Sequence, residues 1–72
     1  MTLQEQFREQ VKKAQLISPH IGTCYIMSNK KQILLHNEQL HKEGKFPYSL
    51  EELQEKGYWV CLIVENGNIC EI

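Results

Sequence analysis

Apolar residues in the N-terminal segment recur at every third or fourth position: Leu3, Phe7, Val11 and Ala14. This spacing places them on one face of an amphipathic α-helix. Thr2 and Glu5 form a capping box, in which the threonine oxygen accepts a hydrogen bond from the amide three residues later. Proline disfavours helical backbone in the residue before it. The pattern therefore predicts a helix over residues 3–16, ending before Ser18-Pro19.

The next segment contains a predicted strand and a stretch with two interpretations. Residues 23–28 (TCYIMS) are rich in strand-forming side chains and predict a strand. Residues 30–43 carry apolar positions that share one helical face, which favours a helix. The competing interpretation is a hairpin that pairs the end of the strand with residues 32–35 across Asn29-Lys30, although this turn lacks a glycine. The helix is favoured, and the hairpin remains open.

Two local signals organise the C-terminal half. Ser49 and Glu52 form a second capping box, which predicts a short helix over residues 50–56. Residues 58–64 are all apolar and predict the best strand of the chain, followed by the type I′ turn signal Asn66-Gly67. A hairpin centred on this turn gives four predicted pairs: Glu65 with Asn68, Val64 with Ile69, Ile63 with Cys70, and Cys61 with Ile72.

These elements predict one α+β domain over residues 1–72, with three helices on a small three-stranded antiparallel sheet. The order α-β-α-α-β-β matches that of a winged helix, with Asn66-Gly67 at the tip of the wing. The helix in the recognition position, LEELQEK, carries three acids and one base, and a phosphate backbone repels such a helix. A winged-helix-like topology is therefore possible, but a nucleic-acid partner is not expected.

Composition excludes several classes of function. The chain has 72 residues with 42% hydrophobic and 24% charged, as in ordinary globular proteins. Its net charge of −1 and pI near 6.3 are unlike those of a strongly basic nucleic-acid binder. The absence of aspartate excludes EF-hand loops and Ser-His-Asp triads, and four isolated glycines exclude the known phosphate-binding loops. No apolar run reaches 18 residues, and the cysteine count is odd, so we expect no membrane partner and a cytoplasmic location.

The cysteines and histidines give no catalytic or metal signature. Cys24, Cys61 and Cys70 all fall in predicted strands, where a buried, structural role is the expected one. A zinc site or a reactive thiol is a minor alternative, because no CxxC or HxxxH spacing occurs. We therefore expect no enzyme activity, no cofactor, no metal and no catalytic residue.

The remaining clue is apolar surface. The hydrophobic gain and the entropic cost of ordering so small a chain nearly cancel, so a partner or a second copy would help it. The residues expected to bind a partner are the helical stripe, two aromatics and a group of acids: Leu3, Phe7, Val11, Tyr58, Trp59, Glu51, Glu52 and Glu55. The expected function is a small non-enzymatic binding or regulatory protein that acts through protein–protein contacts, including a homodimer. An inhibitor or accessory protein of a virus or mobile element fits its size. The alternative is a winged-helix-like regulator of nucleic-acid transactions.

Overall fold

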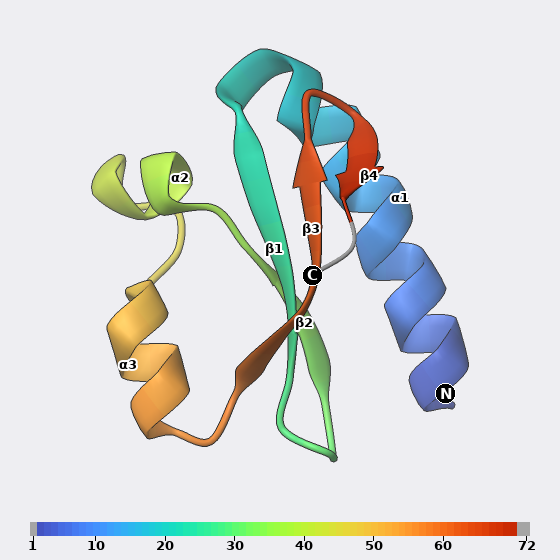
Figure 1. The fold of residues 1–72 in the computed structure, drawn as a ribbon. Coiled ribbons are helices and arrows are strands. Elements are labelled where there is room, and N and C mark those ends of the chain that lie inside the picture. The colour runs from blue at the N-terminus through green and yellow to red at the C-terminus, as the bar shows by residue number, and fades with distance from the viewer. Residues whose placement is uncertain (1, 71–72) are drawn as a thin grey trace.

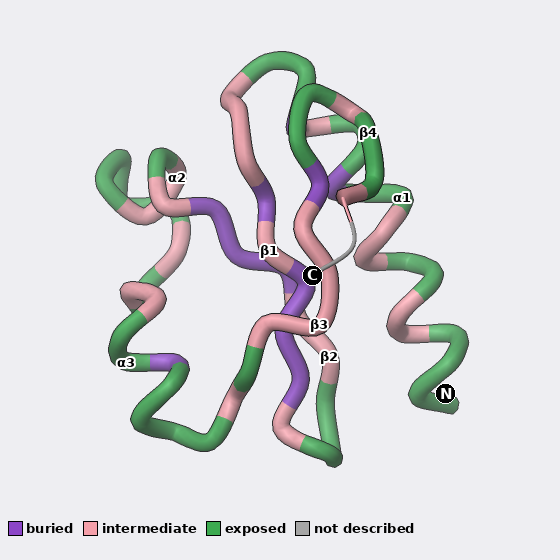
Figure 2. Tube along the Cα trace, in the orientation of Figure 1, coloured by how far each residue is buried: buried purple, intermediate pink, exposed green. Residues whose placement is uncertain are grey.

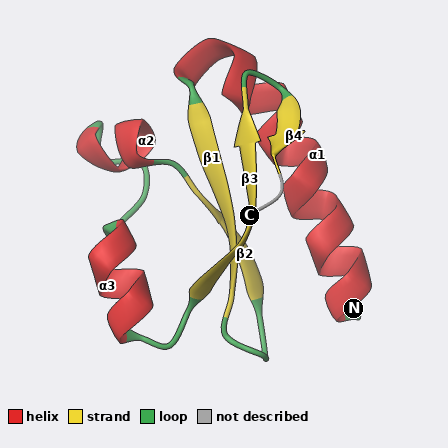
Figure 3. Ribbon diagram, in the orientation of Figure 1, coloured by secondary structure: helices red, strands yellow, loops and turns green. Residues whose placement is uncertain are grey.

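The computed structural model describes residues 2–70 and shows a small α+β fold with a helix layer on each side of an antiparallel sheet (Figure 1). Helix α1 (Leu3–Ile21) lies on one side, and the short helices α2 (Glu38–Lys42) and α3 (Leu50–Glu55) lie on the other (Figure 3). The four strands are β1 (Thr23–Ser28), β2 (Ile33–His36), β3 (Trp59–Glu65) and β4 (Asn68–Cys70). Their order across the sheet is β2-β1-β3-β4.

Strand β1 is central because it pairs with both β2 and β3. Tyr25 faces His36 on β2 and Ile63 on β3. The β1–β3 register shifts after Ile26, where Cys61 is the extra residue of a β-bulge. The sheet contains four strands in the described part of the chain, so the predicted number of three was wrong.

The first helix is longer than predicted. It continues through Ser18 and Pro19 to Ile21, although a proline removes one helical hydrogen bond. The Ser18 side chain is buried, and its hydroxyl lies within hydrogen-bond distance of the Gly22 and Val64 carbonyl oxygens. Tertiary contacts at this end therefore outweigh the local preference against helix before proline.

The favoured helix over residues 30–43 was wrong in its first half. Residues 33–36 form β2, which pairs with β1 in a hairpin, with Ser28 opposite Ile33. The competing interpretation of this segment, a hairpin, is therefore the correct one. The turn needs no glycine because Lys30 adopts φ 76°, and the Asn29 side chain accepts hydrogen bonds from two turn amides. Helix α2 forms only after Asn37, whose side chain caps it through the Leu40 amide.

The C-terminal half follows its prediction closely. Ser49 caps α3 by accepting a hydrogen bond from the Glu52 amide. Asn66 and Gly67 have φ values of 50° and 79°, as a type I′ turn requires. Three predicted pairs of the hairpin are confirmed: Glu65 with Asn68, Val64 with Ile69, and Ile63 with Cys70. The fourth, Cys61 with Ile72, lies outside the described residues.

The observed order α-β-β-α-α-β-β is not that of a winged helix. An additional strand, β2, occupies the first half of the segment expected to be the second helix, and it pairs with β1 at the edge of the sheet. The winged-helix topology was therefore a wrong interpretation, caused by the misassigned segment.

The main core lies between α1 and the sheet, where Figure 2 shows buried stretches along the central strands. It is built from Ala14 of α1 and four strand residues: Cys24, Ile26, Leu35 and Val64. Phe7, Val11 and Leu62 pack against it but stay partly exposed. The predicted stripe of α1 is thus the face that packs on the sheet. Its residues Phe7 and Val11 are only partly buried, and Leu3 is exposed.

Candidate protein-binding surface

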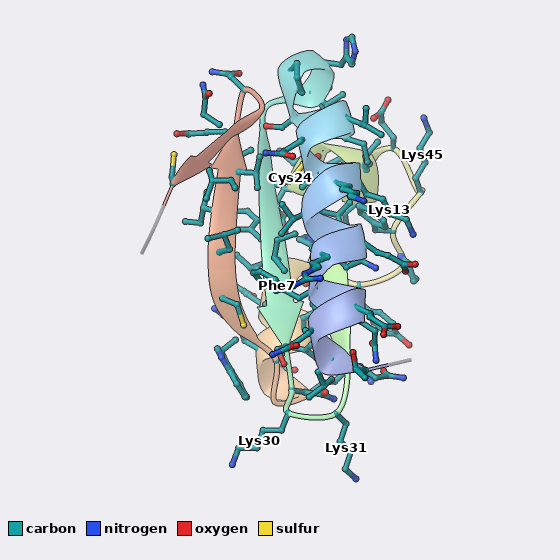
Figure 4. The ribbon with its side chains drawn as sticks, turned by 90° about the vertical axis from the view of Figure 1, so that its right-hand side faces the viewer. Phe7, Lys13, Cys24, Lys30, Lys31 and Lys45 are labelled. Carbon is teal, nitrogen blue, oxygen red and sulfur yellow. The ribbon has the colours of Figure 1, made fainter. Side chains whose placement is uncertain are left out.

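An apolar groove lies between α1 and the β3–β4 hairpin. Phe7 and Val11 form its wall, and Leu62 and Ile69 form its floor. Polar side chains of α1 form its rim: Arg8, Lys12 and Gln15. Its volume is about 500 Å³, and we call it the α1–β4 groove. Figure 4 shows Phe7 directed from α1 toward the sheet.

The groove exists because one helix cannot cover four strands. A helix with its side chains is ~10 Å wide, whereas neighbouring strands are ~4.8 Å apart, so one helix reaches about three strands. Helix α1 packs on β2, β1 and β3. The sheet therefore extends beyond α1 at β4, where Ile69 is 50% exposed.

The rim of the groove is cationic. Arg8 and Lys12 are separated by one helical turn, so both side chains can lie along the same rim. Among residues 2–70, the one contact within 4 Å between an acidic and a basic side chain joins Glu38 and His36. Neither rim cation therefore has an ionic partner at that distance in the described part of the chain.

The predicted stripe residues come together at this surface. Phe7 and Val11 line the groove, and Leu3, which is 42% exposed, continues the stripe at the start of α1. Leu3 and Phe7 also border a second depression at the N-terminal end of α1, which reaches Ile33 of β2. The exposed part of the stripe therefore continues for one helical turn beyond the groove, from Phe7 to Leu3.

The other predicted partner-binding residues lie elsewhere. Trp59 is 45% exposed at the start of β3, opposite Ser28, and the Tyr58 hydroxyl donates a hydrogen bond to Gln32. The acidic side chains are exposed on α3, across the sheet from α1: Glu51, Glu52 and Glu55. The structure thus separates the predicted set into three regions and brings only the stripe into a groove.

Ile69 and Leu62 are groove residues that sequence reasoning did not select. Both belonged to the predicted hairpin, and Ile69 was correctly paired with Val64. That pairing alone places Ile69 on the same face as the buried Val64. The missing information was the lateral position of α1, which leaves this edge of the face open.

A second unpredicted feature is a polar network on the α2–α3 side. The Glu38 carboxylate accepts a hydrogen bond from His36 Nε2 at 2.7 Å and from the Leu50 amide at 3.0 Å. His41 Nδ1 donates to the Phe46 carbonyl oxygen at 2.7 Å. The hydrogen bond from His36 is the main cause that holds the pKa of Glu38 below its usual range. The network connects β2 to α2 and α3, so its first role is to hold these segments together.

The cysteines carry no activated thiol. All three are unbridged, and Cys24 is fully buried beside the Asn37 amide group, with 3.3 Å between Nδ2 and Sγ. Burial raises the pKa of Cys24 and of Cys61 above the usual range, which favours the protonated thiol. Across residues 2–70, no three histidine, cysteine or glutamate side chains gather closely enough to hold a metal ion.

None of the described helices combines the length and the apolar character that crossing a membrane requires. Comparison of the chain with models of protein families, with curated proteins and with solved structures finds no match in any of the three.

Proposed function

We propose that this protein is a small, non-enzymatic binding protein whose partner docks in the α1–β4 groove. The observation that carries the proposal is the open, apolar strip that Phe7, Val11, Leu62 and Ile69 form beside α1. Full burial of a large aliphatic side chain contributes about 1.5–3 kcal/mol. The half-exposed Ile69 alone therefore leaves ~1 kcal/mol that a docked partner would gain.

The groove has the composition of a contact surface rather than a reaction site. Its ionisable side chains are the rim cations Arg8 and Lys12, and its floor and wall are hydrocarbon. The raised pKa values of Cys24 and Cys61 give no support to a thiol nucleophile. The odd number of cysteines supports a reducing compartment, so we place the protein in the cytoplasm.

A photo-crosslinking experiment in the source cell tests the proposal. A photoreactive phenylalanine analogue replaces Lys12 on the groove rim in one variant, and Gln54 on the exposed side of α3 in the control variant. We expect a discrete adduct from position 12 and none of the same mass from position 54. An adduct of twice the chain mass would identify the partner as a second copy.

The proposal is overturned if position 12 gives no adduct, or if both positions give the same set of adducts. Ile69→Glu should remove the position-12 adduct while the far-ultraviolet circular dichroism stays unchanged. Retention of the adduct in that folded variant would place the contact outside the groove.

A further inference from the structure

We infer that the occupant of the α1–β4 groove is an acidic amphipathic helix supplied by a different protein. This inference rests on the proposed function, and it adds the shape and the charge of the partner. Three observations carry it: the width of the uncovered strip, the cations on its rim, and the use already made of this chain's own helices.

General packing distances leave room for a short helix on the uncovered strip. The outer strands of a four-stranded sheet are ~14 Å apart, and helices that share a layer pack 8–10 Å from each other. A helix of about two turns placed beside α1 at that spacing lies over β3 and the short β4, on the N-terminal side of the close approach of Pro19 to the Gly67 turn, with Phe7 and Val11 on its flank and Ile69 beneath it. It would complete the α1 layer of the sheet.

An extended peptide paired with β4 fits this strip less well. Such a strand would lie ~4.8 Å beyond β4, away from α1, and only alternate side chains would face the α1 side. Phe7 and Val11, the wall of the groove, would then stay uncovered because they lie on the inner side. A helix contacts the wall and the floor at the same time.

The rim selects the charge of the partner. Arg8 and Lys12 lie one turn apart, a rise of ~6 Å, and acids at positions i and i+4 of a neighbouring helix have the same spacing. The exposed acids Glu5 and Glu9 precede Arg8 and Lys12 by three residues on α1, and within residues 2–70 neither carboxylate lies within 4 Å of either side-chain cation. Each exposed ion pair adds little affinity, but a partner with bases at these positions would be repelled.

A second copy of this chain does not offer the required helix. Helix α3 is acidic but has only six residues, and its central Leu53 is 3% exposed, so its apolar side is already used. Helix α1 packs its own stripe on the sheet, and its most exposed apolar residue, Leu16, lies outside that stripe. The groove therefore fits a helix from another protein.

Selection from a displayed library of 20-residue peptides tests the inference. The full chain is the bait, and binders that also bind its Ile69→Glu variant are discarded. We expect selected peptides with apolar residues at helical spacing and an excess of Asp and Glu, and transferred nuclear Overhauser effects that show a helix in the bound peptide. In the Arg8→Glu/Lys12→Glu variant we expect about tenfold weaker binding, against no change in the matched control Lys30→Glu/Lys31→Glu.

Lys30 and Lys31 project from the β1–β2 loop, away from the groove, so the control reverses the same number of charges at a remote site (Figure 4). Selected peptides that alternate with a period of two, that are basic, or that ignore the rim reversal would overturn the inference while the groove remains a binding site. A library that gives no binder dependent on Ile69 also overturns it. In that case the crosslink from position 12 decides separately whether the proposed function stands.

Discussion

The Glu38 carboxylate joins β2 to the start of α3, and its removal should loosen the whole α2–α3 side of the molecule. Glu38→Ala deletes the acceptor of two hydrogen bonds, one from His36 Nε2 at 2.7 Å and one from the Leu50 amide at 3.0 Å. The His36 side chain is only 2% exposed, so water cannot easily replace its lost partner. The Leu50 amide begins a helix near the surface, where water can reach it.

The expected loss of unfolding free energy follows from these two donors. An unsatisfied buried donor costs about 1–3 kcal/mol, and a donor that water can reach costs much less. Because the Glu38 side chain is 42% exposed, solvent already weakens its interactions, and we expect a loss of about 1–2 kcal/mol. A 72-residue chain has roughly 4–11 kcal/mol of stability in total, so this is a large fraction.

Urea unfolding followed by circular dichroism measures the effect. With a slope of ~1 kcal/mol per M for so small a protein, the midpoint should fall by about 1–2 M. Glu43→Ala is the matched control, because Glu43 is exposed and lies just after α2. Its midpoint should stay within ~0.5 M of the unchanged protein.

The pH dependence gives the sharper test. Hydrogen bonding to His36 lowers the pKa of Glu38 in the folded state. At acidic pH the folded state therefore binds fewer protons at Glu38 than the unfolded state does. The stabilisation is complete above the ordinary glutamate pKa of ~4.3 and is lost as the pH falls through the lower folded value. The difference between the unchanged protein and Glu38→Ala should therefore shrink in that range. Equal midpoints for Glu38→Ala and Glu43→Ala, or a difference that stays constant down to pH 3, would refute the reasoning.

Three further predictions follow from single positions. Gly67→Val should lower the unfolding free energy by more than ~1 kcal/mol, because φ is 79° there and a Cβ would lie 3.2 Å from Pro19 Cγ; thermal unfolding measures this, and a loss no larger than that of an exposed-site variant would contradict it. Ser49→Ala should cost about 1 kcal/mol in urea unfolding through the lost cap to the Glu52 amide, and restoration by Ser49→Asp is the check that the cap is responsible. Cys24 should resist alkylation in the folded protein and react on unfolding, because it is fully buried and its thiol pKa is raised; labelling of Cys24 at the rate of an unfolded thiol in mass spectrometry would show that the α1–β1 core opens readily.

The parts of the fold that sequence predicted well are those set by local chemistry. The Ser49 cap and the Asn66-Gly67 turn each depend on a few adjacent residues, and both have the predicted geometry. The β3–β4 register followed from the turn, because a two-residue turn fixes which residues face each other.

The errors arose where distant contacts decide between two local options. The β1–β2 hairpin uses Lys30 at positive φ, and the Asn29 side chain, rather than a glycine, stabilises its turn. Pairing with β1 then selects a strand for a segment whose apolar spacing also suits a helix. Helix α1 passes through Pro19 because the buried Ser18 hydroxyl lies at the β3 backbone, which no sequence pattern indicates.

The candidate surface was predictable only in part. The stripe that contains Phe7 and Val11 was visible as a pattern, and Ile69 was assigned to the correct face of the hairpin. Whether such a stripe is buried or open depends on which strands lie under the helix. That depends on the sheet order, and α1 packs mainly on β2 and β1, the strands away from β4.

The central position of β1 also determines the order in which the chain can fold. The β1–β2 and β3–β4 hairpins each close over a few residues, and such hairpins form within microseconds. The seam between β1 and β3 instead joins residues such as Thr23 and Glu65, which are 42 positions apart, so closing it costs about 2 kcal/mol more chain entropy than closing a four-residue turn. We therefore expect pairing along that seam to be slower than closure of either hairpin, so that substitutions beside the seam change the folding rate more than substitutions in either turn.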